Sequence, residues 1–306
     1  MTLKGRVMRS TGSWYEVAAE DGVEYQCRMR GKIRLDGIKE TNPIAVGDYV
    51  LFEVDHGTGA ITKIVDRKNH ILRQSVKKTG HSHVLAANVD QVMLMATLVQ
   101  PRTSLGFIDR FLATAESFRI PQLLLFNKND LLNTETREQQ QQLADLYDAI
   151  GVTTIQLCAL QDDLTDLRRL LANKVTLIAG HSGVGKSTVL NRLSPAIQQK
   201  IGEISDFSEK GKHTTTFAEM FQLDAHTFII DTPGIKEWGL VDMTQQEISD
   251  YFPDMREVRL DCKFGARCIH INEPGCAVIK GVQEGKISIS RYDSYLSMVM
   301  GEDNRK

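Results

Sequence analysis

A phosphate-binding loop constrains this chain more than any other feature of its sequence. Residues 180–187 read GHSGVGKS and fit the pattern G-x-x-x-x-G-K-[ST]. An apolar run at 175–179 precedes the loop and a helical pattern at 186–193 follows it, which is the context that the pattern requires. The glycines let backbone N–H groups wrap a phosphate, and the helix N-terminus adds positive potential. A nucleotide-binding α/β sheet is therefore predicted.

The loop also assigns individual roles. Lys186 is expected to reach the β- and γ-phosphates, and the hydroxyl of Ser187 is expected to ligate Mg²⁺. A glycine turn that binds nothing is the alternative, and the flanking strand and helix disfavour it. The nucleotide-binding residues predicted here are Gly180, His181, Ser182, Gly183, Val184, Gly185, Lys186, Ser187 and Thr188.

A second motif predicts which base is bound. Asn127, Lys128 and Asp130 directly follow an apolar strand at 122–126. The Asp130 carboxylate can accept hydrogen bonds from N1–H and the 2-amino group of guanine, whereas adenine would leave it unpaired. An ordinary Asn/Asp turn is the alternative reading. Cys158 and Ala159 end the next strand, where their backbone is expected to support the base, so Cys158 is not predicted to be a nucleophile.

A third motif, DTPG, is expected to sense the γ-phosphate. It follows an apolar strand at 226–230, so Asp231 is expected to hold Mg²⁺ through water and the Gly234 N–H to contact the γ-phosphate. Between the two motifs lies GKHTTT, a polar segment of the kind that orders around a γ-phosphate. Either Thr214 or Thr215 is expected to complete the Mg²⁺ shell, and we favour Thr215.

Ras-like enzymes position the attacking water with a glutamine that follows the glycine of the third motif. This chain has Ile235 there, which cannot hydrogen-bond to water. His213, within GKHTTT, is the nearest candidate, and a solvated loop histidine is the rival interpretation. The catalytic residues predicted are His213, Lys186 and Thr215.

The motifs occur in a rotated order. The guanine motif precedes the phosphate loop, whereas ordinary GTPases have it late in the chain. Such a rotation is tolerable when the original termini lie close together and the cut falls in a surface loop. Strand and helix patterns alternate from residue 89 to residue 193, which predicts a doubly wound parallel sheet.

The first 72 residues have a different pattern. Short strand-like runs at 6–9, 14–18, 24–29, 49–54 and 60–65 alternate with turn residues, which suggests either a barrel of the oligonucleotide-binding (OB) type or an unspecialised β-domain. Basic side chains suited to phosphate contacts are Arg28, Arg30, Lys32, Arg34, Lys39, Arg67, Lys68, Arg73, Lys77 and Lys78. Trp14, Tyr15 and Tyr25 are candidate stacking faces for bases. Solvated strand faces are the alternative.

A cysteine cluster lies near the C-terminus. Cys262, Cys268, His270 and Cys276 offer three thiolates and one imidazole within 15 residues, a set that suits one tetrahedral, structural Zn²⁺. Unrelated cysteines in a reducing cell are the alternative. Because the chain shows neither a signal peptide nor an apolar stretch near the roughly 20 residues of a membrane span, a cytoplasmic location with no membrane partner is expected.

In this order, NKND, GHSGVGKST, GKHTTT, DTPG and the cysteine cluster resemble the circularly permuted small-ribosomal-subunit biogenesis GTPases of the RsgA (YjeQ/EngC) family. The resemblance covers essentially the whole chain. It implies an OB-type barrel at 1–72 that binds RNA, a circularly permuted P-loop GTPase domain at 73–240 and a zinc-binding domain at 241–306. It also implies slow GTP hydrolysis to GDP and phosphate, stimulated by the small ribosomal subunit and its rRNA during late maturation, and it supports a catalytic role for His213. A monomer is expected.

Overall fold

The computed structural model describes residues 2–30, 43–74, 82–194, 218–231 and 243–302. These residues form two compact units. The first unit comprises Met1–Met93 with Ala159–Glu237, and the second comprises Leu94–Cys158 with Trp238–Lys306. The residues of GKHTTT, including His213, Thr214 and Thr215, and Gly234 lie outside the described residues.

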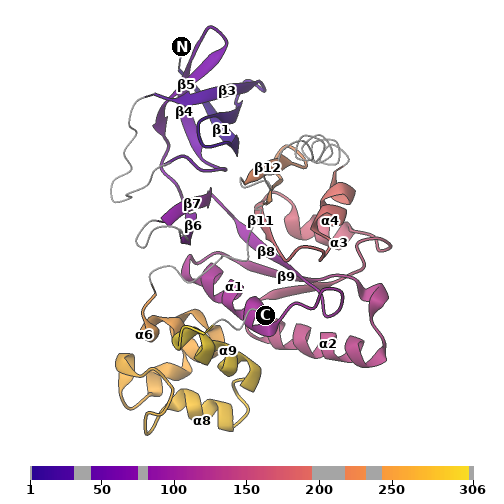
Figure 1. Ribbon diagram of the computed structural model, residues 1–306, viewed down its shortest axis with the longest axis vertical. Helices are drawn as coiled ribbons and strands as arrows, with labels where there is room; N and C mark the ends of the chain where they lie inside the picture. Colours follow the sequence, from indigo (N-terminus) through magenta and orange to yellow (C-terminus); the bar gives the residue numbers. More distant parts are fainter. Residues whose placement is uncertain (1, 31–42, 75–81, 195–217, 232–242, 303–306) are drawn as a thin grey trace. The chain divides into compact units, whose positions relative to one another are not determined.

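The N-terminal part of the first unit is a closed β-barrel (Figure 1). Its strands are β1 (Thr2–Ser10), β2 (Tyr15–Ala19), β3 (Glu24–Met29), β4 (Tyr49–Asp55) and β5 (Thr58–Ile64). They hydrogen-bond in the order β1-β2-β3-β5-β4, and β4 pairs back to β1, which closes the barrel. Alternate residues point inward, so Val7, Val17, Phe52 and Ile61 form a fully buried core. The predicted barrel is confirmed.

A β-hairpin that the sequence did not predict follows the barrel. Its strands are β6 (His70–Gln74) and β7 (Ser82–Ala87), which pair antiparallel. Nearby, Arg67 donates to both carboxylate oxygens of Asp48 at 2.6 Å, and both side chains are almost completely buried. This ion pair fixes the turn that leads into β4.

The rest of the first unit carries part of the predicted α/β sheet. Its strands β11 (Val175–Ala179) and β13 (Phe228–Asp231) are parallel, and the helices are α3 (Thr165–Leu171) and α4 (Lys186–Leu193). Strand β12 (Glu219–Gln222) runs antiparallel to β13 and contacts the barrel strand β1 through the pair Arg9↔Glu219. The sheet is therefore mixed at this edge, because a connection as short as that between β12 and β13 allows only antiparallel pairing.

The second unit continues the alternation of strands and helices. It holds the end of β8 (Gln91–Ala96), then β9 (Gln122–Phe126) and β10 (Thr153–Gln156), with β9 and β10 parallel. Helix α1 (Leu105–Ser117) begins at Ser104, whose side chain accepts a hydrogen bond from the N–H of Phe107. Helix α2 (Thr134–Ala149) begins with a capping box formed by Asn133 and Thr136.

Short helices form the C-terminal part of the second unit (Figure 1). They are α6 (Gln245–Ile248), α7 (Pro253–Arg256), α8 (Ala277–Gln283) and α9 (Ile289–Val299), with 3₁₀ turns η3 (Ser249–Tyr251), η4 (Val258–Asp261) and η5 (Gly265–Arg267). Phe252, Met255, Val278 and Tyr295 are buried among the cluster cysteines. Helix α9 packs on α1, so this small region shares a core with the sheet-forming part of its unit.

None of the described helices is both long and apolar enough to cross a lipid bilayer.

Candidate functional site

The phosphate loop connects the end of β11 to the start of α4, as its sequence predicts. Gly183 and Gly185 have φ values of +85° and +98°, in the left-handed region that favours glycine. Val184 between them is fully buried and anchors the loop. Ser187 is exposed on the first turn of α4, so its hydroxyl is accessible from solvent.

Lys186 lies over this loop. Its Nζ donates hydrogen bonds to the carbonyl oxygens of Gly180 at 2.6 Å and His181 at 3.2 Å. Burial lowers the pKa of the Lys186 ammonium, and the nearby carboxylate of Asp231 partly offsets that effect. The ammonium is therefore desolvated and held next to the loop, an environment in which a phosphate would interact with it strongly.

Asp231 is brought to the same place by sheet pairing. It is the last residue of β13 and lies in register with Ile178 of β11, two residues before Gly180. Since parallel strands end at the same edge of a sheet, the carboxylate and the phosphate loop share that edge. The first unit thus assembles a glycine loop, an ammonium, a serine hydroxyl and a carboxylate, a set that can bind a magnesium–phosphate complex.

The guanine motif directly follows β9 in the second unit. Asn127 is buried, and its N–H donates to Ala96 O at 2.9 Å. The side chain of Asn129 accepts a hydrogen bond from Gln140 at 2.7 Å, and the Asn129 N–H donates to Leu157 O at 3.3 Å. These contacts connect the motif to α2 and to the end of β10.

Two charged residues of this motif have different surroundings. Lys128 has a left-handed backbone, with φ +68°, and its Nζ donates to the carbonyl oxygen of Gln100. Asp130 lies in the 3₁₀ turn η1 (Asn129–Leu131) and is exposed, so its carboxylate is accessible to a base. Cys158 and Ala159 are both buried, as expected for residues that contribute their backbone.

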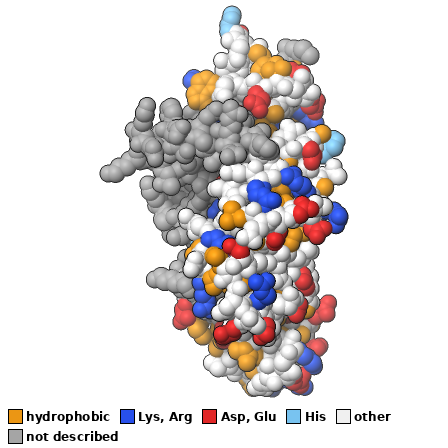
Figure 2. Space-filling model, turned by 90° about the vertical axis from the view of Figure 1, so that its right-hand side faces the viewer, with side chains coloured by type: hydrophobic (Ala, Val, Ile, Leu, Met, Phe, Trp, Pro, Cys, Tyr) orange, Lys and Arg blue, Asp and Glu red, His pale blue; other side chains and the backbone are white. Residues whose placement is uncertain are grey.

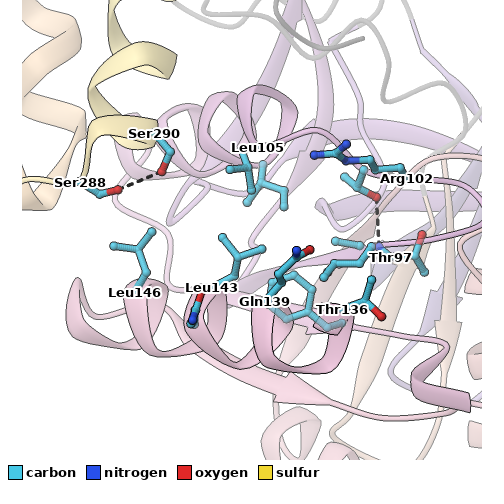
Figure 3. A pocket seen from close by; sticks show the side chains of 15 residues that line it. Thr97, Arg102, Leu105, Thr136, Gln139, Leu143, Leu146, Ser288 and Ser290 are labelled. Atoms are coloured by element: carbon cyan, nitrogen blue, oxygen red, sulfur yellow. Dashed lines mark hydrogen bonds between the residues drawn. The ribbon is translucent and has the colours of Figure 1, made fainter. Parts of the chain in front are cut away.

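A cavity of about 700 Å³ lies between α1 and α2, and the sequence did not predict it. Figure 3 shows Leu105 of α1 pointing toward Leu143 and Leu146 of α2 across it. Arg102, in the loop before α1, also lines the cavity. The i, i+3 spacing of the two α2 leucines was the available signal, but such spacing is equally typical of side chains that pack in a core.

The cysteine cluster has the geometry of a zinc site. One ligand atom from each of Cys262, Cys268, His270 and Cys276 can be chosen so that all four lie within 4.8 Å of one another, and all four residues are buried. Zn–S bonds of about 2.3 Å in a tetrahedron separate two sulfurs by about 3.8 Å. The Sγ atoms of Cys262 and Cys276 are 3.8 Å apart, and His270 Nδ1 lies 3.5 Å and 3.3 Å from them. The residues present fit a zinc ion.

The surroundings of the cluster orient its ligands. His270 turns Nδ1 to the sulfurs and places Nε2 3.1 Å from Ser249 Oγ, a second contact typical of metal-bound histidines. The Glu273 carboxylate accepts hydrogen bonds from the N–H groups of Ile269, Ile271 and Asn272, which hold the chain on both sides of His270. Burial raises the pKa of the Cys268 thiol to about 12 and lowers that of His270 to about 4, so metal binding has to displace thiol protons.

The barrel presents some of the predicted RNA contacts but not all of them. The exposed Arg28 guanidinium lies 3.6 Å from the centroid of the half-buried Trp14 ring, and the two side chains together could contact a base and its phosphate. The prediction that Tyr15 offers a stacking face is wrong, because its side chain points into the barrel and only 2% of the residue is exposed. Arg67 is also unavailable because it is buried against Asp48. Lys32, Arg34, Lys39, Lys77 and Lys78 lie outside the described residues.

Comparisons with known proteins agree with this geometry. The family model described as "RsgA GTPase" matches residues 64–241, and that of the "RsgA N-terminal domain" matches residues 4–61. A small ribosomal subunit biogenesis GTPase RsgA from Christiangramia forsetii is 48% identical over 307 residues, spanning 99% of this chain and 97% of that protein. Its namesake from Phocaeicola vulgatus is 48% identical over 306 residues, spanning 99% of this chain and 98% of that protein.

Solved structures resemble the chain along its whole length. The crystal structure of YjeQ from Thermotoga maritima aligns with a TM-score of 0.78 and 30% identity, covering 100% of both chains. The structure of YloQ, titled a circularly permuted GTPase, aligns with a TM-score of 0.74 and 30% identity, covering 100% of this chain and 96% of that one.

Proposed function

This chain belongs to the RsgA family of GTPases and is a GTP hydrolase, and we propose that it binds the small ribosomal subunit and assists its late maturation. The observation that carries the proposal is the phosphate-binding edge of the first unit, where the phosphate loop, Lys186 and Asp231 come together; the second unit adds an accessible Asp130 in the guanine motif. Relatives that match nearly the full chain carry the name of small-subunit biogenesis GTPases, which supports the choice of partner.

We infer that one GTP molecule uses both motifs. Asn127, Lys128, Asp130, Cys158 and Ala159 would hold the guanine base. The phosphates would be held by residues 180–188 together with Asp231 and the N–H of Gly234. Asp130 selects guanine because its carboxylate needs two N–H donors, which adenine does not offer at those positions.

In the hydrolysis step, the chain's own residues supply charge and orientation. Lys186 would stabilise the negative charge that grows on the phosphate oxygens, because its ammonium is already desolvated beside the loop. His213 would orient the attacking water. Magnesium, ligated by Ser187 and Thr215, would neutralise the charge that develops between the β- and γ-phosphates.

The remaining assignments follow the same proposal. Residues 1–72 would form the RNA-binding domain, 73–240 the permuted GTPase domain and 241–306 the zinc-binding domain. One structural Zn²⁺ per chain would be held by Cys262, Cys268, His270 and Cys276. We expect a cytoplasmic monomer that binds GTP and GDP and contacts small-subunit rRNA.

Replacement of His213 tests the catalytic assignment. We expect His213→Ala to reduce the turnover number by about 10²–10⁴, the range for a positioned proton-transfer group, while GTP affinity stays nearly constant. Single-turnover hydrolysis and binding of a fluorescent GTP analogue measure the two quantities. His56→Ala, a histidine on the barrel with 97% of its side chain exposed, is the matched control. Equal losses of affinity and turnover would reject the role.

Turnover with and without purified small subunits tests the function as a whole. Stimulation of GTP hydrolysis is expected, since GTPases often await a partner that raises their rate by about 10³–10⁵. If turnover were unchanged while subunit binding depended on the nucleotide, the chain would instead be an RNA-binding module whose shape GTP sets. A chain that neither binds nor responds to small subunits would contradict the proposal.

A further inference from the structure

A second cavity, of about 980 Å³, lies within the first unit and away from the phosphate loop. Its walls come from the barrel strands β1 and β4 and from residues at the start of β11 and β13, including Arg6, Tyr49, Val175 and Phe228. Parallel strands present their starts at the edge opposite to their ends, so this cavity and the phosphate loop occupy opposite edges of the sheet. It is therefore separate from the proposed nucleotide site.

Arg6 is the unusual residue of this cavity. Only 8% of it is exposed, and its guanidinium lies over two aromatic rings, 5.0 Å from the centroid of Tyr49 and 4.7 Å from that of Phe228. Its Nε is enclosed and has no hydrogen-bond partner among the described residues. The two cation–π contacts stabilise the cation but do not satisfy its N–H donors, and the Nε–H in particular has no acceptor among the described residues.

The neighbouring charges do not neutralise Arg6. The Asp90 carboxylate acts on Arg6 electrostatically, yet Asp90 already pairs with Lys68 and accepts the N–H of Val175 at 2.7 Å. Burial lowers the pKa of the Arg6 guanidinium, and Tyr49 and Asp90 only partly offset this. A buried cation with unused donors is costly unless an anion satisfies it.

We propose that this cavity is a phosphate-binding subsite in which the edge of the Arg6 guanidinium donates hydrogen bonds to the oxygens of a single phosphate group. The planar, permanently charged guanidinium can donate two parallel hydrogen bonds to phosphate oxygens, and the two aromatic rings hold it in place. Glu20, Glu24 and Asp66 are exposed and also line the cavity, so a second phosphate group inside it would be repelled and a single phosphate group is favoured. The phosphate comes either from solution or from the backbone of a bound RNA strand. The inference uses the proposed function only in naming RNA as one source.

The test uses the full-length, zinc-replete protein saturated with GDP and magnesium, so that the phosphate loop is filled. In the first arm, inorganic phosphate replaces chloride at constant ionic strength while the Arg6 Nε–H signal is followed by ¹⁵N NMR. We expect a saturable shift of that signal and a rise in Tm, and we expect Arg6→Gln to abolish the rise. Lys4→Gln is the matched control: Lys4 is a nearby cation of β1 that also lies over Tyr49, at 5.4 Å, but is exposed and paired with Glu20. It should keep the full rise.

The second arm measures binding of a single-stranded RNA oligonucleotide as a function of salt. If Arg6 contacts a backbone phosphate, Arg6→Gln reduces the slope of log K against log salt by about 0.7, whereas Lys4→Gln leaves it unchanged. A response to inorganic phosphate alone assigns the subsite to free phosphate, and a response in both arms assigns it to the RNA backbone. Either result supports a phosphate subsite.

Two outcomes overturn the proposal. In the first, neither inorganic phosphate nor the RNA oligonucleotide changes the Arg6 Nε–H signal of the folded wild-type protein. This measurement does not depend on whether the Arg6→Gln variant folds. The other is an equal response to acetate, which would identify a carboxylate site. GTP turnover of the wild-type protein is measured in parallel, so that loss of turnover with an intact phosphate response would count against the proposed function and leave this inference standing.

Discussion

Asp130 and Lys186, both assigned to the proposed nucleotide site, differ in their exposure to solvent. The carboxylate of Asp130 is exposed after β9, whereas the ammonium of Lys186 is held by two carbonyl oxygens of its own loop. An exposed acceptor can exchange water for a base, and a desolvated cation gains more from a phosphate than a hydrated one does. In the proposed site, loss of the Asp130 carboxylate should therefore change which base is bound.

Asp130→Asn should change base preference rather than abolish binding. The amide offers N–H donors where guanine also presents donors, so we expect GTP affinity to fall by about 10²–10⁴. Xanthosine triphosphate, which carries a carbonyl at that position, should bind the variant better than GTP does. Competition binding of both nucleotides measures the switch, with Asp55→Asn, an exposed carboxylate of the barrel, as the control. Equal weakening for both nucleotides would contradict base reading by Asp130.

At the scale of elements, a buried ion triad joins three helices of the second unit. Arg291 of α9 donates to Asp109 of α1 at 2.6 Å and to Asp254 of α7 at 2.9 Å. Tyr147 of α2 adds a hydrogen bond to Asp109 at 3.0 Å. Burial raises the pKa of Asp109, and Arg291 counteracts this. Removal of any one of these three charged residues would therefore leave a buried charge without its partner.

Arg291→Met should destabilise the second unit by about 3–5 kcal/mol, because it leaves two buried carboxylates without a cation. Urea unfolding, followed by far-UV circular dichroism, measures the decrease in the free energy of unfolding. Loss of Arg291 raises the pKa of Asp109 in the folded state further above its value in the unfolded state. The folded variant therefore binds more protons than the unfolded one. Its loss of stability relative to the wild type should shrink as the pH falls toward that raised pKa. The triple variant with Asp109→Asn and Asp254→Asn should recover part of the stability. A deficit below about 1 kcal/mol that did not vary with pH would contradict the role of the triad.

Ser249 contacts His270 of the proposed zinc site. Its hydroxyl lies 3.1 Å from His270 Nε2 and it is fully buried, so it fixes the ring that turns Nδ1 to the sulfurs. We expect Ser249→Ala to weaken zinc binding about 10–100-fold, as measured by competition with a chromogenic chelator. Ser297→Ala, an exposed serine of α9, should have no effect. Unchanged zinc affinity in Ser249→Ala would show that the ring is oriented by other contacts.

At the scale of the whole molecule, the net charge is slightly negative and does not attract an anionic partner. The formal net charge is −2, and Figure 2 shows basic and acidic side chains interspersed over the described residues of the visible face. An RNA partner must therefore be held by particular residues, such as Arg28 with Trp14, rather than by the overall charge.

Binding to small subunits should weaken steeply as salt is added, because phosphate contacts release counterions. Arg28→Gln should reduce the slope of log K against log salt by about one, while Lys63→Gln, an exposed cation of β5, should change it little. Filter binding over a series of salt concentrations measures both slopes. A flat salt response of the wild-type protein would count against a phosphate-led interface.

The sequence by itself determined the elements that carry local signals. Strands β9 and β11 and helix α4 occupy the residues predicted for them, because each is a continuous apolar run or a helical pattern bounded by motif residues. The barrel strands were found within a few residues for the same reason. The cluster of Cys262, Cys268, His270 and Cys276, which could hold a metal ion, was also recognisable in the sequence, because its four residues lie close together along the chain.

Only the tertiary structure decided features that depend on contacts between distant residues. Strands β6, β7 and β12 were not identified from the sequence. They are defined by their pairing, that of β6 with β7 and that of β12 with β13 and with the remote strand β1. The short C-terminal helices span too few turns for a helical period to be seen, and packing around buried residues such as Phe252 stabilises them. Tyr15, Arg6 and Arg291 look like surface residues in sequence, yet all three are buried, because burial depends on which face of an element meets a partner remote in the chain.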